Sequence, residues 1–112
     1  MPDLPPAPTL GDFQDYVRTL EEQRGFSGNS IEQTALLMGE EVGELFKAIR
    51  KRLRMSVDAN SAVGEVDQEL ADVLIYLCSL ANRLGVDLET AFRAKEEVNK
   101  QRTWTSALPA LP

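Results

Sequence analysis

The sequence predicts an all-α protein. Three observations support this: apolar residues recur at helical spacing, capping signals divide the chain into four such segments, and no stretch alternates β-branched and polar residues as a strand would. The chain has 112 residues, 43% of them hydrophobic and 27% charged, which is typical of one soluble globular domain. A domain of this size buries a modest core, so we expect a bundle of four to five helices that is completed by oligomerisation.

The first helix is predicted over residues 10–23. Thr9 and Asp12 have the spacing of a capping box, and the apolar residues that follow recur at helical intervals: Phe13, Tyr16, Val17 and Leu20. The stretch 24–29 contains two glycines and is expected to break the helix. The Pro-rich residues 1–8 are expected to be flexible.

The second helix is predicted to begin after Ser30, which forms a second capping box with Gln33, and to end near residue 53 ahead of a polar loop. At about 100° per residue, one apolar arc contains Leu37, Met38, Val42, Leu45, Phe46, Ala48 and Ile49. This arc indicates the face that packs against the bundle. Gly39 lies mid-helix, where glycine costs about 1 kcal/mol relative to alanine, and its small size would permit close packing.

The third helix is predicted over residues 62–84, with Gly85 as its stop signal. Its apolar arc contains Val66, Val73, Tyr76, Leu77, Leu80 and Leu84. The stretch 70–81 is apolar almost all round, which is typical of a helix buried in a bundle or an oligomer.

The fourth helix is predicted to follow Asp87 as its N-cap and to end near residue 102. Residues 106–112 are expected to form a loose tail, which leaves residues 9–105 as the single domain. Two cations and an amide share one face of this helix: Lys95, Asn99 and Arg102. Cationic side chains at such positions either lie along the edge of a core with their charges in water or bind an anion.

Carboxylates interrupt the apolar arcs of the second and third helices. Glu41 falls inside the first arc and Glu44 lies one turn further at its margin, whereas Glu40 projects toward the polar side. On the third helix, Glu69 lies among the apolar residues and Asp72 lies at the edge of the arc. Such runs of acids are often solvated faces, but carboxylates beside an apolar wall repel one another unless they are paired or bind metal. An all-oxygen set suits Mg²⁺ or Mn²⁺ better than Zn²⁺.

Composition excludes several other classes of function. The net charge of −6 opposes docking on nucleic acid polymers or anionic membranes, and no apolar run is long enough to span a bilayer. The absence of His removes His-dependent nucleophile arrangements and His-bearing metal sites. The single Cys78 lies in an apolar run and is expected in the core, which fits a cytoplasmic protein.

Four motifs together resemble one known family. They are EEVGEL at 40–45, ELADVL at 69–74, GVDL at 85–88 and KEEVNKQR at 95–102. Their combination and spacing resemble the MazG-like nucleotide pyrophosphohydrolases of the all-α NTP pyrophosphatase superfamily. The resemblance covers about residues 10–104.

The resemblance implies a metal-dependent hydrolase. The metal ligands would be Glu41, Glu44, Glu69 and Asp72, holding Mg²⁺ with Mn²⁺ as a possible substitute. Glu40 would be an outer ligand or would orient water. The substrate would be a nucleoside triphosphate, cleaved between the α and β phosphates to give a nucleoside monophosphate and pyrophosphate, with nucleotide-pool house-cleaning as the expected role. Such enzymes commonly assemble as homodimers or homotetramers.

The resemblance also suggests residues that bind the nucleotide. Lys95, Asn99 and Arg102 match polar positions where contacts to phosphate or sugar are expected. Phe26 and Trp104 lie outside the predicted helix interiors and are candidates for stacking on the base.

Three alternatives remain from the sequence. The substrate within the superfamily could be phosphoribosyl-ATP. The same apolar arcs would also serve a non-catalytic helical oligomerisation or partner-binding module, which predicts no dependence on divalent ions. A di-iron carboxylate bundle is disfavoured because it usually requires a Glu-x-x-His pair on its helices.

Overall fold

The computed structural model of the chain describes residues 3–103 and contains, within that range, four helices and no strand. They are α1 (Leu10–Arg24), α2 (Ile31–Arg52), α3 (Val66–Arg83) and α4 (Leu88–Asn99). The all-α prediction is therefore confirmed. Across the described part of the chain, no helix combines the length and hydropathy that crossing a lipid bilayer requires. Trp104 and the tail predicted at 106–112 lie outside the described residues, as do residues 1–2.

Both predicted capping boxes are present. The hydroxyl of Thr9 accepts a hydrogen bond from the Asp12 backbone N–H at 3.1 Å, and the Asp12 carboxylate accepts one from the Thr9 N–H at 2.9 Å. Ser30 and Gln33 make the same reciprocal pair at 3.0 and 2.8 Å. These bonds satisfy backbone donors that the first turn of a helix leaves free, which is why α1 and α2 begin where the sequence predicts.

Two helix boundaries differ from the prediction. α3 begins at Val66 and not at residue 62; its N-cap, Glu65, makes no side-chain capping bond, so no local signal marks this start. α4 ends at Asn99 and not near Arg102. Beyond it the backbone continues in single turns, such as the bond from the Arg102 N–H to the Asn99 carbonyl, because no glycine or proline gives a sharp stop.

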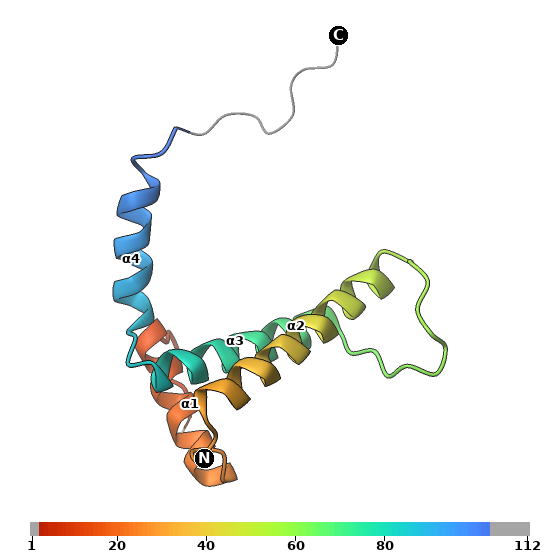
Figure 1. The fold of residues 1–112 in the computed structure, drawn as a ribbon, viewed down its shortest axis with the longest axis horizontal. Coiled ribbons are helices and arrows are strands. Elements are labelled where there is room, and N and C mark those ends of the chain that lie inside the picture. The colour runs from red at the N-terminus through yellow and green to blue at the C-terminus, as the bar shows by residue number, and fades with distance from the viewer. Residues whose placement is uncertain (1–2, 104–112) are drawn as a thin grey trace.

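The helices form an antiparallel pair with two attachments at one end (Figure 1). α2 and α3 lie side by side and are joined by the long loop 53–65. α1 packs across α3 at the end of the pair where α2 begins, and α4 leaves from that same end and projects away from the pair. The result is an open molecule, with extents of 58 × 46 × 32 Å, in which α1 is the main packing partner of α4.

The core of one chain is small. Val17, Leu20 and Cys78 form its buried cluster, and the apolar side chains packed against it are Phe13, Tyr16, Leu74, Ile75 and Leu88. Much of the predicted apolar arcs stays accessible: Phe46 of α2 is 59% exposed and Leu77 of α3 is 38% exposed. α3 is thus apolar on two faces, one covered by α1 and one open.

A buried glutamine fixes the junction of α1, α3 and α4. The Gln14 side-chain amide donates to the Val86 carbonyl at 2.8 Å and to Asn82 Oδ1 at 3.1 Å, and its oxygen accepts from the Leu88 N–H at 2.9 Å. Asn82 in turn donates to the Gln14 carbonyl at 2.9 Å. Because Leu88 is the first residue of α4, these bonds set the direction in which α4 leaves the molecule.

Candidate active site

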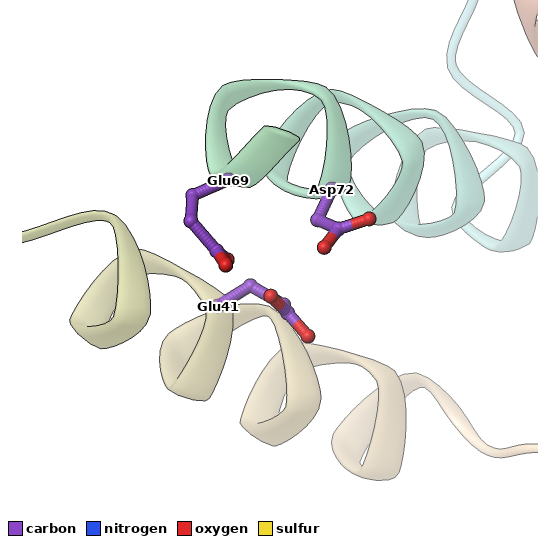
Figure 2. A group of neighbouring side chains, drawn as sticks. All are labelled: Glu41, Glu69 and Asp72. Atoms are coloured by element: carbon purple, nitrogen blue, oxygen red, sulfur yellow. The ribbon is translucent and has the colours of Figure 1, made fainter. Parts of the chain in front are cut away.

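Three carboxylates converge between α2 and α3. Glu41 projects from α2, and Glu69 and Asp72 project toward it from the facing helix (Figure 2). One carboxylate oxygen from each lies within 4.8 Å of the others, and all three residues are half-buried. We call Glu41, Glu69 and Asp72 the carboxylate cluster.

Local geometry explains why these acids meet. Glu69 and Asp72 are three residues apart in α3, so their side chains emerge one turn apart on the same face. The antiparallel pairing of α2 and α3 then places Glu41 opposite them. The sequence had predicted each of these three residues as a site residue from its place in or beside an apolar arc.

The cluster is electrostatically unfavourable as it stands. Burial raises the pKa of Glu41 above its ordinary value, and the negative charges of Asp72 and Glu69 raise it further. Within residues 3–103, no lysine or arginine forms an ion pair with any of the three acids. Close, unpaired carboxylate oxygens are the donor set that hard divalent cations prefer, so the residues fit such a cation.

Glu44 and Glu40 lie beside the cluster but do not join it. The Glu44 carboxylate is 3.8 Å from the ammonium of Lys47, and its charge contributes to the raised pKa of Glu41. Glu40 is exposed, although its charge is among those that raise the pKa of the Tyr76 phenol. Three of the five predicted acids therefore converge, and Glu40 and Glu44 lie outside the cluster.

Gly64 lies directly against the cluster. A Cβ atom built at this glycine would lie 2.1 Å from Glu69 Oε1, which is far inside van der Waals contact. The absence of a side chain at Gly64 therefore leaves space for the Glu69 carboxylate to turn toward α2. By contrast, nothing lies within 4 Å of a Cβ built at Gly39, so the close packing expected there does not occur within one chain.

A cavity of about 210 Å³ opens next to the cluster, and Glu41 and Asp72 form part of its wall. The turn between α1 and α2 contributes Phe26 and Asn29, and α3 contributes Tyr76. The cavity is smaller than the roughly 300–1,000 Å³ of pockets that enclose a whole drug-sized ligand. One chain thus encloses space for only part of a ligand of that size, and Phe26, which the sequence suggested as a base contact, lines it.

Sequence reasoning missed Tyr76 as a site residue. Its ring was assigned to the apolar arc of α3, but the residue lines the cavity. Burial raises the pKa of its phenol, and the charges of Glu41 and Asp72 raise it further. The available signal was its spacing: Tyr76 follows Asp72 by four residues and so shares the face that carries the acids.

The polar residues of α4 lie apart from the cluster in the same chain. Lys95 and Arg102 are exposed, and neither they nor Asn99 line the cavity. The side-chain oxygen of Asn99 is buried without a hydrogen-bond partner among the described residues.

Comparisons with solved structures define the class of protein. A MazG-like pyrophosphohydrolase of cyanophage S-2L, solved with dGDP and three catalytic Mn²⁺ ions per active site, superposes with a TM-score of 0.66 and 31% identity over 91% of this chain and 87% of that one. Two crystal structures of iMazG from Vibrio DAT 722, one of the C-tagged and one of the N-tagged protein, superpose with a TM-score of 0.59 and 35% identity over 82% of this chain. The match covers 98% and 94% of those chains. The fold is that of an all-α, MazG-like pyrophosphohydrolase.

Sequence comparison gives the family. The MazG nucleotide pyrophosphohydrolase domain matches residues 29–103. A dATP/dGTP diphosphohydrolase of cyanophage S-2L is 51% identical over 39 residues, which are 35% of this chain and 37% of that relative. This chain belongs to the MazG nucleotide pyrophosphohydrolase family, which confirms the resemblance noted from its motifs and places it among the nucleotide-hydrolysing enzymes.

Repulsion within the carboxylate cluster makes a prediction for the metal-free protein. Glu69→Gln removes one of the negative charges that raise the pKa of Glu41 and supplies an amide that can donate to a neighbouring carboxylate. In EDTA at neutral pH, the melting temperature should rise by about 2–5 °C. Calorimetric melting curves measure this, with Glu22→Gln, at an exposed position of α1, as a control for the change in net charge.

The rise in melting temperature caused by Glu69→Gln should depend on pH in a defined direction. An acid with a raised pKa in the folded state penalises folding above its unfolded pKa, and the penalty disappears as the pH falls and the acid becomes protonated. The advantage of Glu69→Gln should therefore shrink on acidification. An advantage that is absent at neutral pH, or equal to that of Glu22→Gln, would contradict the electrostatic account.

Proposed function

We propose that this protein hydrolyses a deoxynucleoside triphosphate between its α and β phosphates, releasing the nucleoside monophosphate and pyrophosphate, with Mg²⁺ as the cofactor and Mn²⁺ as a substitute. The observation that supports this most directly is the convergence of three carboxylates within 4.8 Å beside a cavity. The family of the domain supports the reaction class, and the Mn²⁺ ions of the cyanophage structure support a divalent metal.

The acids of the site have different proposed roles. Glu41, Glu69 and Asp72 hold the cation, and Glu44 completes the set by moving away from Lys47, since their 3.8 Å contact is partly exposed and weak. Glu40 is an outer ligand or orients the attacking water. When bound, the cation neutralises charge on the phosphates and acidifies water. No covalent enzyme intermediate is needed.

We expect the base and sugar of the nucleotide to bind in the cavity. Phe26 is 49% exposed and lines the cavity, so its ring is available to stack on a base. Glu41 and Asp72 border the same space, which would bring the phosphates of a nucleotide held there to the carboxylate cluster. The names of the cyanophage relative and its bound dGDP favour a purine deoxynucleotide. Hydrolysis of such substrates suits nucleotide-pool house-cleaning in the cytoplasm.

The active enzyme is proposed to be a homodimer or homotetramer. Leu70 and Leu77 of α3 and Leu84, the C-cap of α3, follow one another at intervals of seven, and they are 52%, 38% and 55% exposed. On α4, Phe92 is 64% exposed. Since α4 projects away from the helix pair (Figure 1), a neighbouring subunit is the means by which Lys95, Asn99 and Arg102 would reach a carboxylate cluster and its phosphates. Trp104 remains a candidate base contact.

The first prediction concerns turnover. Pyrophosphate release should be measured with dATP, dGTP, dUTP, dCTP, the four common ribonucleotides and phosphoribosyl-ATP, with Mg²⁺ and with EDTA. The wild type should release pyrophosphate only with the cation. Glu69→Gln should lower kcat by about 10²-fold or more because it weakens cation binding, while Glu22→Gln should not change it. Lys95→Ala should chiefly raise KM.

Other outcomes identify the alternatives. Release of orthophosphate and a nucleoside diphosphate would overturn the proposed bond. Preference for phosphoribosyl-ATP would reassign the substrate. If the protein neither hydrolyses any nucleotide nor binds Mn²⁺, the remaining alternative is a non-catalytic helical oligomerisation or partner-binding module.

The second prediction concerns Gly64. Gly64→Ala should force the Glu69 carboxylate away from its present place, because the flexible end of that side chain yields more easily than backbone. Calorimetry should show Mn²⁺ affinity reduced by about tenfold, equivalent to one weakened ligand contact of about 1.4 kcal/mol, with helical content unchanged. Gly28→Ala is the matched control, since a Cβ there meets nothing within 4 Å. Equal Mn²⁺ affinity in both variants would contradict the steric argument.

The third prediction concerns assembly. Sedimentation at micromolar concentration should give a dimer or a tetramer, because Leu70, Leu77 and Leu84 are exposed at intervals of seven residues and would be buried in an interface. Leu77→Asp should dissociate it, while Leu4→Asp, in the segment before α1, should leave the mass unchanged. A monomeric wild type that still hydrolyses nucleotides would exclude a site shared between subunits.

A further inference from the structure

One arginine near the end of α3 is held by partners from three parts of the chain. The Arg83 side chain is only 13% exposed, and its guanidinium lies 2.7 Å from the Glu21 carboxylate of α1. Its Nε donates to the Asn29 carbonyl at 2.9 Å, and Nη2 donates to the Phe26 carbonyl at 2.7 Å. Nη1 also donates to Ser79 Oγ at 2.6 Å. The planar fork of donors on arginine makes this combination possible.

Two of these bonds hold the turn between α1 and α2. Gly25 ends α1 in the left-handed conformation, with φ of 79°, and the following residues carry little apolar anchorage, since Phe26 is 49% exposed. Within the turn, the backbone makes a bond from the Asn29 N–H to the Phe26 carbonyl at 3.1 Å. Arg83 binds both of these residues by their carbonyls, and so fixes the turn against α3.

Arg83 contacts residues that line the cavity. All four partners of Arg83 line it: Glu21, Phe26, Asn29 and Ser79. Arg83 itself is not among the lining residues and instead borders a separate surface hollow. It therefore touches the wall of the cavity from behind and does not reach its interior.

We infer that Arg83 is a positioning residue that sets affinity for the nucleotide by holding the Phe26–Asn29 wall of the cavity, independently of the carboxylate cluster. The inference rests on the proposed function, because it assigns the cavity to the base and sugar. If Arg83 had a purely structural role, that role would depend on its buried ion pair with Glu21. Removing one partner of such a pair destabilises the fold, because the other charge is left buried and unpaired.

Arg83→Lys separates these roles. Lysine keeps a positive charge for Glu21, but its single ammonium cannot reproduce the arginine fork toward the Asn29 and Phe26 carbonyls and Ser79. Steady-state kinetics with dATP and dGTP should show KM raised about tenfold and kcat changed by less than about twofold. Mn²⁺ affinity measured by calorimetry without nucleotide should stay equal to that of the wild type, and amides of residues 25–30 should exchange with deuterium faster.

The matched control is Arg18→Lys. Arg18 also joins an acid of its own helix, Asp15 at 3.0 Å, to a residue of α3, Asn82 at 3.2 Å, but neither of these partners lines the cavity. Its KM should equal that of the wild type. If Arg83→Lys does not fold, the charge-neutral pair Glu21→Gln with Arg83→Met leaves no unpaired buried charge and must show the same rise in KM.

The outcomes distinguish failure of the role inferred for Arg83 from failure of the proposed function. An unchanged KM in a folded Arg83 variant, or equal losses of kcat and Mn²⁺ affinity, would overturn the inference. A wild type that hydrolyses no nucleotide would overturn the proposed function, and the exchange rates of residues 25–30 would then decide alone whether Arg83 holds the turn.

Discussion

Mutual repulsion between carboxylates is the constraint that the rest of the structure must meet. Glu41, Glu69 and Asp72 face one another across the α2–α3 pair with oxygens within 4.8 Å, and their charges raise the pKa of Glu41. The packing of α2 against α3, and of α3 against α1, opposes this repulsion. Such a cluster beside a small core is expected to lower the stability of the metal-free fold, as is typical of groups retained for function.

The elements and the acids were predictable because both depend on short-range patterns. Capping boxes at Thr9 and Ser30 specify where α1 and α2 begin, and spacing on a helix places Glu69 and Asp72 on one face. The start of α3 was not predictable, since Glu65 makes no capping bond. The cavity was not predictable either, because its lining comes from α1, the α1–α2 turn, α2 and α3. From sequence alone, Tyr76 is indistinguishable from a core residue.

The sequence predicts the apolar arcs, but only part of each arc is covered within one chain. Periodicity identifies an apolar face without identifying its partner. α3 directs Cys78 toward α1 and leaves Leu77 exposed, and sequence alone does not distinguish these two faces. The same reasoning applies to the polar residues of the fourth predicted helix. Helical spacing groups Lys95, Asn99 and Arg102, but the direction of α4 is set by side-chain bonds of Gln14, which is distant in sequence.

The region that matches the family begins at residue 29, whereas the cavity also uses Leu20, Glu21 and Arg24 of α1. The acids and one wall of the cavity therefore belong to the shared domain, and the opposite wall comes from a segment that precedes it. Substitutions in α1 can reshape the space beside the carboxylates without altering any of them. Under the proposed function, substitutions in α1 would change which base fits beside the carboxylates while the residues that hold the cation stay the same.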